Sequence, residues 1–320
     1  MFPIEKIQQT REIILPHIRK TPLWLSGSLT DEFGVPVYVK YELFQRTGSF
    51  KVRGAFNKLL SLNDEEKARG VVTVSGGNHA QAVAFASSKL ALDAIVIMPE
   101  NTPTNYIEAT RSYGAKIELV PTIADAFQSA ENHRKAGRIF VHPFDDPLVI
   151  LGQGTLGLEI MEDLPETTDL FVSIGGGGLM TGVASAVKAL NPQIRIWGVE
   201  TEGADAMKKA LQAGEPVTLP AITSIAKTLG APAVSETTLK AAQNYLEDLI
   251  VVTDSEAIQA LSFILERLKT LSEPAASCTL AAAWRLKSGF NPDSKIVLIL
   301  CGGNYSASDY CQHRSQFIQF

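Results

Sequence analysis

The chain has 320 residues, a hydrophobic content of 45% and a formal net charge of −5. This length accommodates one large domain or two medium domains, and the apolar content is ample for a packed core. The mildly acidic balance, without a basic stripe, argues against nucleic acid as a main partner. No apolar run reaches the roughly 18 residues that a membrane span needs, so we expect no membrane partner either.

The three cysteines, Cys278, Cys301 and Cys311, lie late in the chain and lack the spacing of a disulfide framework or a metal site. Residues 1–6 show no basic region followed by an apolar run, which a signal peptide would have. We therefore expect a reducing, cytoplasmic environment.

Strand patterns and helix patterns alternate along the chain. Short runs rich in β-branched residues predict buried parallel strands at 37–40, 70–74, 94–98, 116–120, 170–174, 195–199 and 295–300. Helical patterns lie between them, for example at 78–90 and 182–190. This alternation predicts the α/β class. Ligands of such folds bind at the carboxyl ends of strands, and each glycine-rich loop of this chain follows a strand and precedes a helix.

The first candidate loop is Gly48-Ser49-Phe50-Lys51. A lysine that acts as a covalent catalyst must lose its proton easily and approach a carbonyl carbon without obstruction. The small residues Gly48 and Ser49 let the backbone approach a planar ligand. Phe50 supplies an apolar wall, which would lower the lysine pKa by desolvation. The alternative interpretation is a surface lysine at the start of a helix.

The second candidate loop is Ser75-Gly76-Gly77-Asn78-His79, directly after a predicted strand. Its N–H groups and the Ser75 hydroxyl would bind a carboxylate, as helix N-termini bind anions. Asn78 is able to donate a hydrogen bond to a phenolic oxygen on a flat ring. His79 falls in the first turn of the helix, where an imidazole that braces the loop is the better interpretation than a catalytic base.

The third candidate loop is Gly175-Gly176-Gly177-Gly178-Leu179. Consecutive glycines free the backbone to point several N–H groups at one anion, and the dipole of the following helix adds to the attraction, so a phosphate is the natural guest. A dinucleotide site is the rival, with Glu200 at a suitable distance, but the pattern G-x-G-x-x-G places Met180 where it requires glycine. A tight turn without a ligand is the third interpretation.

The last candidate loop, Cys301-Gly302-Gly303-Asn304, follows the final strand. A thiol there makes only a neutral hydrogen bond to a pyridine nitrogen, whereas an aspartate would protonate that nitrogen. The alternative for Cys301 is a small buried hydrophobic residue.

These loops, in this order, resemble the fold-type II family of pyridoxal 5'-phosphate (PLP) enzymes, specifically its threonine/serine dehydratase and serine racemase branch. The strings Thr21-Pro22-Leu23, Gly152-Gln153-Gly154-Thr155 and Glu273-Pro274-Ala275-Ala276 add to the resemblance, which runs from about Ile18 to Tyr305. It implies a tryptophan-synthase-β-like fold with two open, twisted, mostly parallel sheets flanked by helices. It also implies a large PLP-binding domain (1–69 and 148–320), a small inserted domain (70–147) and a homodimer.

The resemblance also implies roles for the loop residues. Lys51 would hold PLP covalently and later remove the α-proton of the substrate. The remaining cofactor-binding residues would be Phe50, Asn78, Gly175, Gly176, Gly177, Gly178, Leu179, Glu273 and Cys301. The substrate carboxylate would be bound by Ser75, Gly76, Gly77, Asn78 and His79, with Ser75 also catalytic. The role of Glu273 is open between electrostatic and structural.

The activity that the resemblance implies is PLP-dependent deamination of an L-β-hydroxy amino acid by α,β-elimination, as in threonine/serine dehydratases. Serine racemases of this branch have Ser-Ser-Gly-Asn-His, where the second serine is an acid–base group, and Gly76 stands at that position here. A lyase is therefore favoured, while a serine racemase or a dehydratase for phenylserine or 3-hydroxyaspartate remains the alternative. A nucleotide-binding oxidoreductase and a non-catalytic PLP-binding protein are the readings from other classes.

Many relatives bind a divalent cation through a glutamate and an aspartate six residues later. Glu200 matches the glutamate, but Ala206 occupies the second position, so a metal site at Glu200 is in doubt. The length after the last strand leaves no room for the regulatory domain of biosynthetic threonine dehydratases, and we expect no end-product feedback.

Overall fold

The computed structural model describes residues 2–318, in which the strands form two sheets. The larger one, here called the large sheet, has six strands in the order β1-β2-β10-β7-β8-β9. Their bounds are Leu23–Leu25 (β1), Val37–Lys40 (β2), Ile296–Ile299 (β10), Asp169–Ser173 (β7), Arg195–Thr201 (β8) and Asp248–Val252 (β9). Neighbouring strands run parallel, except that the edge strand β1 pairs antiparallel with β2.

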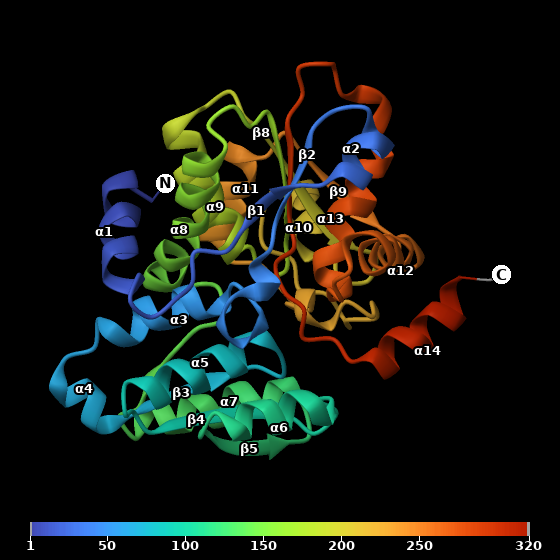
Figure 1. The fold of residues 1–320 in the computed structure, drawn as a ribbon. Helices are drawn as coiled ribbons and strands as arrows, with labels where there is room; N and C mark the ends of the chain where they lie inside the picture. The colour runs from blue at the N-terminus through green and yellow to red at the C-terminus, as the bar shows by residue number, and fades with distance from the viewer. Residues whose placement is uncertain (1, 319–320) are drawn as a thin grey trace.

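The second sheet, the small sheet, has four parallel strands in the order β5-β4-β3-β6. Their bounds are Val71–Val74 (β3), Ala94–Pro99 (β4), Lys116–Val120 (β5) and Ile139–Phe140 (β6). Because side chains alternate along a strand, Val71 and Val96 belong to one apolar cluster and Val72 and Val74 to another, so both faces are buried. Figure 1 shows this sheet and its helices below the large sheet.

Fourteen α-helices surround the sheets in the described part of the chain. They are α1 (Ile4–Ile14), α2 (Gly27–Phe33), α3 (Lys51–Leu60), α4 (Asp64–Arg69), α5 (Asn78–Lys89), α6 (Thr104–Ser112), α7 (Ile123–Lys135), α8 (Pro147–Asp163), α9 (Gly178–Leu190), α10 (Ala206–Ala213), α11 (Glu236–Tyr245), α12 (Asp254–Phe263), α13 (Pro274–Arg285) and α14 (Ala307–Phe317). No helix among residues 2–318 is both long enough and apolar enough to cross a membrane.

All seven predicted strands are confirmed, and the α/β class with them. The strands β1, β6 and β9 were not predicted, and two of these have three residues or fewer, which is too short for a periodic pattern. Helix α9 begins at Gly178 rather than at 182, because Gly177 adopts a left-handed φ of 91° that turns the chain into the helix.

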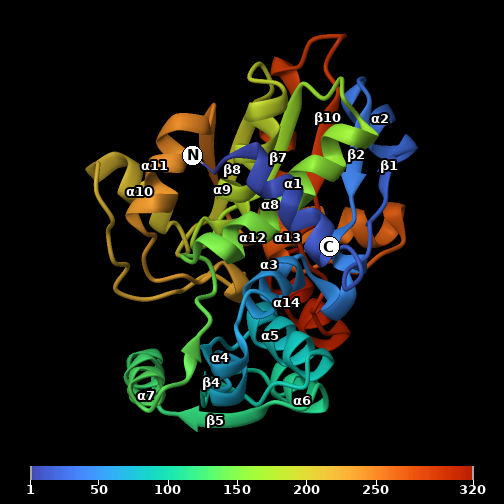
Figure 2. The same cartoon turned by 90° about the vertical axis from the view of Figure 1, so that its left-hand side faces the viewer.

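Helix α3 connects the two layers. Val52, Phe56 and Leu59 of α3 lie in the same apolar cluster as Val83 of α5 and Val96 of β4. Figures 1 and 2 both show α3 between the large sheet and α5. The first residue of α3 is Lys51, so this packing places the lysine between the two sheets, at the carboxyl ends of their strands.

Candidate active site

The loop before Lys51 is held by main-chain hydrogen bonds to the Cys301 loop. Phe50 donates its N–H to the Cys301 carbonyl at 3.1 Å, and Gly303 donates to the Gly48 carbonyl at 2.9 Å. Ser49 also forms an isolated β-bridge with Gly302. Two predicted site loops that lie 250 residues apart in the sequence are thereby adjacent in space.

The amine of Lys51 lies in a buried environment. Its Nζ donates a hydrogen bond to the Pro143 carbonyl at 2.7 Å and lies 5.2 Å from the centre of the Phe50 ring. Burial lowers the pKa of this amine to about 8, although the nearby Cys301 and Glu273 groups act in the opposite direction. Far more of this amine is therefore uncharged near neutral pH than of an ordinary lysine, and a nucleophile or general base requires the uncharged form.

The Ser75 loop leads directly into helix α5, which begins at Asn78 without a side-chain cap. The orphan N–H groups of such an uncapped N-terminus, together with the helix dipole, favour an anion. The Ser75 hydroxyl accepts a hydrogen bond from the N–H of Gly77 at 3.2 Å, so it also shapes the loop. A Cβ built on Gly76 would lie 2.6 Å from Oγ1 of Thr102, which occupies the adjacent space.

His79 is buried next to the segment that follows β6. Its Nε2 lies 3.2 Å from the Val141 carbonyl, and its Nδ1 has no hydrogen-bond partner in the described residues. Burial, with a further contribution from the Lys51 charge, holds the pKa of His79 well below its usual value. The imidazole is therefore neutral and donates to a main-chain carbonyl, which agrees with a bracing role.

The tetraglycine loop follows β7 and opens helix α9, whose N-terminus also has no side-chain cap. A Cβ on Gly176 would lie 2.2 Å from the Phe144 ring, and one on Gly175 would lie 2.9 Å from the Leu229 carbonyl. The glycines are thus required by close packing as well as by the direction of the chain. The N–H groups of this uncapped terminus fit a phosphate.

Cys301 and Glu273 lie beside the Lys51 amine. The Cys301 sulfur lies 3.8 Å from Oγ of Ser173, and burial raises the thiol pKa well above its usual value, so the thiol stays neutral. Glu273 accepts hydrogen bonds at Oε1 from Asn78 at 2.8 Å and from Thr228 at 2.9 Å. Its Oε2 is buried without a partner in the described residues, and burial raises the pKa of the carboxyl group.

The model of one protein family, described as pyridoxal-phosphate dependent enzyme, matches residues 14–302. The chain belongs to this family. The match covers the first three candidate loops and reaches Gly302 in the fourth, so the fold-type II resemblance read from the sequence is confirmed, together with its fold.

Curated relatives extend over nearly the whole chain. It is 39% identical to the L-threonine ammonia-lyase of Geobacter sulfurreducens over 306 residues, 95% of this chain and 76% of the relative. It is 37% identical to the catabolic L-threonine dehydratase of Escherichia coli over 318 residues, 97% of this chain and 95% of the relative. Among solved structures, that of maize serine racemase has a TM-score of 0.92 and 36% identity, and the match covers 98% of this chain and 97% of that one.

The residues present fit PLP, the cofactor of this family. The lysine amine is buried and partly deprotonated, two uncapped helix N-termini face the region of the site loops, and a neutral thiol lies close by. Oε2 of Glu273 and Nδ1 of His79 are buried polar atoms without a hydrogen-bond partner in the described residues, and a bound polar ligand would satisfy them.

A divalent cation fits this chain less well. The carboxylate of Glu200 accepts hydrogen bonds from the N–H groups of Met207 and Lys208, both at 2.8 Å, and so caps helix α10. No group of three or more histidine, cysteine, aspartate or glutamate residues suited to a metal occurs within residues 2–318. Alanine at 206 supplies no second carboxylate, and the Glu200 carboxylate is used by the main-chain N–H groups of α10.

Sequence analysis missed the segment that connects β6 to α8. Pro143 accepts the hydrogen bond of the Lys51 amine, and the ring of Phe144 lies on Gly176. His142 shapes this segment, since its Nδ1 accepts the N–H groups of Phe144 at 3.3 Å and Asp145 at 2.8 Å. A main-chain carbonyl carries no residue-type signal, and no sequence pattern would have identified Pro143 as a neighbour of the lysine.

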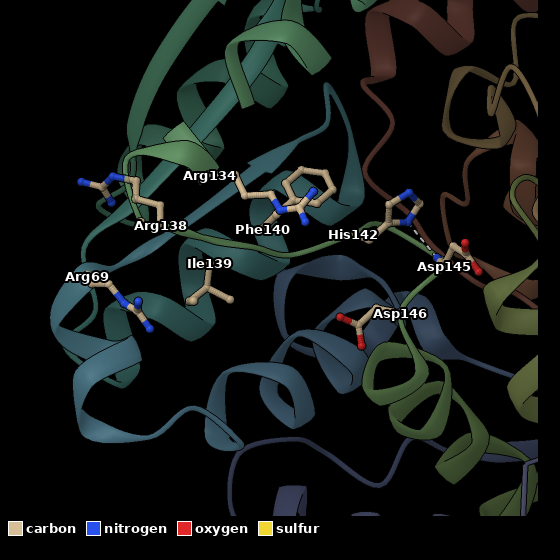
Figure 3. A pocket seen from close by; sticks show the side chains of 9 residues that line it. Arg69, Arg134, Arg138, Ile139, Phe140, His142, Asp145 and Asp146 are labelled. Atoms are coloured by element: carbon tan, nitrogen blue, oxygen red, sulfur yellow. Dashed lines mark hydrogen bonds between the residues drawn. The ribbon is translucent and has the colours of Figure 1, made fainter. Parts of the chain in front are cut away.

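A surface pocket of about 520 Å³ lies beside the same segment. Figure 3 shows Arg69 and Arg138 at one end of the lining, Arg134 in front of Phe140 near the middle, and His142 and Asp145 at the other end. Arg69 and Arg134 stand in the last turns of α4 and α7, where cations complement the helix dipole. None of the predicted site residues lines this pocket, so it is separate from the candidate active site.

Proposed function

We propose that this protein is a PLP-dependent ammonia-lyase that converts L-threonine or L-serine into a 2-oxo acid and ammonia. The observation that carries the proposal is the buried Lys51 amine, with a pKa lowered to about 8, next to two uncapped helix N-termini. The curated relatives named L-threonine ammonia-lyase and L-threonine dehydratase support the reaction and the substrate class.

PLP, when bound, supplies an electron-accepting ring that stabilises negative charge at the α-carbon of an amino acid. Lys51, Phe50, Asn78, Glu273 and Cys301 would surround this ring. The phosphate would be held by Gly175, Gly176, Gly177, Gly178 and Leu179.

The amino acid would be bound by the loop from Ser75 to His79, whose N–H groups receive the carboxylate. The uncharged amine of Lys51 would remove the α-proton, and the ammonium so formed would give a proton to the β-hydroxyl, which leaves as water. The enamine product takes up water and releases ammonia, so a four-carbon substrate gives 2-oxobutanoate. The neutral Cys301 thiol favours this immediate loss of the hydroxyl, because it does not add positive charge to the ring.

A serine racemase is the second candidate, because maize serine racemase is a close structural relative. Racemisation needs an acid–base group on the face of the α-carbon opposite Lys51. Gly76 stands at the position of that group, and Thr102 fills the space next to it. Elimination is therefore the better supported reaction. Phenylserine and 3-hydroxyaspartate share the same chemistry and remain substrate alternatives.

We also propose a small inserted domain at 70–147, a cytoplasmic location and a homodimer. The homodimer is supported by the family resemblance and by exposed apolar side chains at the edge of the large sheet. Trp24 and Leu25 of β1 are 57% and 55% exposed, and Phe44 lies close to Trp24. Exposed apolar groups on an edge strand favour association.

The test of the activity is 2-oxo acid release from L-threonine by the PLP-loaded protein. The wild type should form 2-oxobutanoate, and Lys51→Ala should be slower by at least about 1,000-fold, because the base is lost. Lys67→Ala, which removes an exposed lysine of α4, is the matched control. Deamination by Lys51→Ala at the normal rate would sink the scheme, and D-serine formed from L-serine would favour the racemase.

A further inference from the structure

Asn304 connects three loops of the candidate site. Its Nδ2 donates one hydrogen bond to the main-chain carbonyl of Thr47 at 2.7 Å and another to Oδ1 of Asn78 at 2.8 Å. Thr47 belongs to the loop before Lys51, and Asn78 begins helix α5. Asn304 itself is the last residue of the Cys301 loop, so one amide group connects all three loops.

The direction of these hydrogen bonds is determined at both ends. The Thr47 carbonyl is only able to accept, so the NH₂ group of Asn304 must point toward it. At the other end, Oε1 of Glu273 accepts from Nδ2 of Asn78 at 2.8 Å and from Thr228 at 2.9 Å. Asn78 therefore turns its side-chain oxygen toward Asn304. One of its two side-chain N–H groups donates to Glu273, and the other is left for a further partner.

Two glycines make room for this network. A Cβ on Gly48 would lie 2.6 Å from Oδ1 of Asn304, and the φ of Gly48 is +71°. A Cβ on Gly302 would lie 2.6 Å from Oε1 of Glu273 and 2.9 Å from Nδ2 of Asn78. The amide groups thus lie directly against the backbone, where a rotated amide would meet main-chain atoms.

Tyr106 reaches the network from the small sheet. It lies in α6 and is only 8% exposed, and its hydroxyl donates a hydrogen bond to the main-chain carbonyl of Asn304. Burial raises the pKa of Tyr106, with Glu273 as the next contribution, so the phenol keeps its proton and remains a donor. Tyr106, which lies in a helix beside the small sheet, is therefore hydrogen-bonded to the loop that follows strand β10 of the large sheet.

We propose that Asn304 is a positioning residue that sets the orientation of the Asn78 amide, and that Tyr106 holds Asn304 in place from the small sheet. The proposal rests on the proposed function in one respect, namely that the remaining N–H of Asn78 serves the bound PLP. Asn304 and Tyr106 act through Asn78 and are not catalytic residues themselves.

The test is Asn304→Asp, which keeps the shape of the side chain but replaces its two N–H donors by an oxygen. The Thr47 carbonyl and Oδ1 of Asn78, both acceptors, then face a third acceptor. We expect the dissociation constant for PLP, titrated into the apoprotein, to rise by at least about tenfold, as for buried acceptors that lose their donor. Tyr106→Phe removes one hydroxyl and should raise it by roughly threefold or more.

Two controls match these variants. Asn191→Asp makes the same change at the end of α9, where only the side-chain oxygen is used, to accept the N–H of Gln193. Tyr113→Phe removes a hydroxyl at the end of α6, from a ring that packs edge-on against Phe85. Both controls should bind PLP like the wild type.

A second measurement separates positioning from general destabilisation. In apoprotein, Asn304→Asp and Tyr106→Phe should accelerate amide hydrogen exchange at residues 46–50 and 75–79, with exchange in β7 and β8 unchanged. In an Asn78→Ala background, the effect of Asn304→Asp on PLP affinity should largely vanish, because the two residues act in series.

Wild-type PLP affinity and wild-type exchange in Tyr106→Phe and Asn304→Asp would overturn the proposal, as would full additivity with Asn78→Ala. If Asn304→Asp does not fold, the conservative Tyr106→Phe decides by the same two measurements. Neither measurement uses an amino-acid substrate. A wild type without lyase activity would therefore refute the proposed function and leave this proposal standing.

Discussion

Gly176 has no room for a side chain, because a methyl group built on it would lie 2.2 Å from the ring of Phe144. The constraint is not one of backbone angle, since the left-handed φ of this loop belongs to Gly177. It is a packing constraint between the loop that precedes α9 and the segment whose Pro143 carbonyl accepts the hydrogen bond of the Lys51 amine. Gly176, together with Gly178, which also packs against Phe144, thus allows two parts of the candidate site to approach each other closely.

Gly176→Ala should therefore weaken both the fold and cofactor binding. Overpacking of this kind costs about 1–3 kcal/mol of unfolding free energy. Urea unfolding of the apoprotein and titration with PLP measure the two effects. Gly289→Ala is the control, because nothing lies within 4 Å of a Cβ at that position. Equal stability and equal PLP affinity for the two variants would contradict the packing argument.

Helix α3 is anchored by a buried network of charges around Arg53, two residues after Lys51. Arg53 is fully buried and bonds to Glu42 at 2.8 Å and to Glu159 at 2.7 Å, and Lys40 bonds to Glu159 at 2.8 Å. Burial alone would lower the pKa of Arg53. The two carboxylates raise this pKa by more, so the guanidinium is always charged. Two cations and two carboxylates balance, and this neutrality makes the burial tolerable.

Arg53→Met should destabilise the protein by about 3–5 kcal/mol, because it leaves Glu42 buried without its cation and Glu159 with Lys40 alone. The quantity to measure is the free energy of unfolding in urea. Lys287→Met, which breaks the exposed ion pair with Glu32, should cost less than about 1 kcal/mol. A cost for Arg53→Met as small as that of the control would show that the network does not anchor α3.

The sequence predicted those elements whose signal is local. Buried parallel strands are continuous β-branched runs, and seven of them were found, whereas β1 and β6 are too short to show a pattern. The loops around Lys51, Ser75 and Gly175 carry residue types that only an unusual backbone or a ligand requires. The fold brings the residues of these loops together, and their spacing along the sequence does not predict that proximity.

The contacts that complete the site could not be predicted in the same way. Pro143 acts through a main-chain carbonyl, and Asn304 acts through partners 257 and 226 residues away. Asn304 falls in a candidate loop, but neither its residue type nor that of Pro143 indicates these partners. The same is true of Thr228, which lies in no motif and bonds to Glu273. Such contacts follow only from tertiary structure.

On the scale of the whole molecule, the large sheet has an apolar edge. β1 is its terminal strand, and Trp24 lies 5.3 Å from the ring of Tyr41 and 6.4 Å from that of Phe44. Aromatic side chains that pack on one another and remain exposed are typical of the centres of protein interfaces. This edge is where the proposed homodimer has its best supported contact.

Trp24→Glu should weaken the dimer by at least about tenfold in its dissociation constant, since it places a charge in an apolar contact. Sedimentation analysis measures this, because the dimer has twice the 34.6 kDa mass of one chain. Leu190→Glu, at a side chain 48% exposed on α9, is the control. If both variants stay dimeric at all concentrations, the β1 edge is not the interface.

The contact between Gly76 and Thr102 limits the routes by which this protein could change its chemistry during evolution. A serine at 76 would supply the acid–base group of a racemase, but its Cβ would lie 2.6 Å from Thr102 Oγ1. Threonine is branched at Cβ and has few rotamers to move into, so the loop would be strained. Under the proposed function, we therefore expect a serine at 76 to destabilise the loop unless Thr102 changes as well.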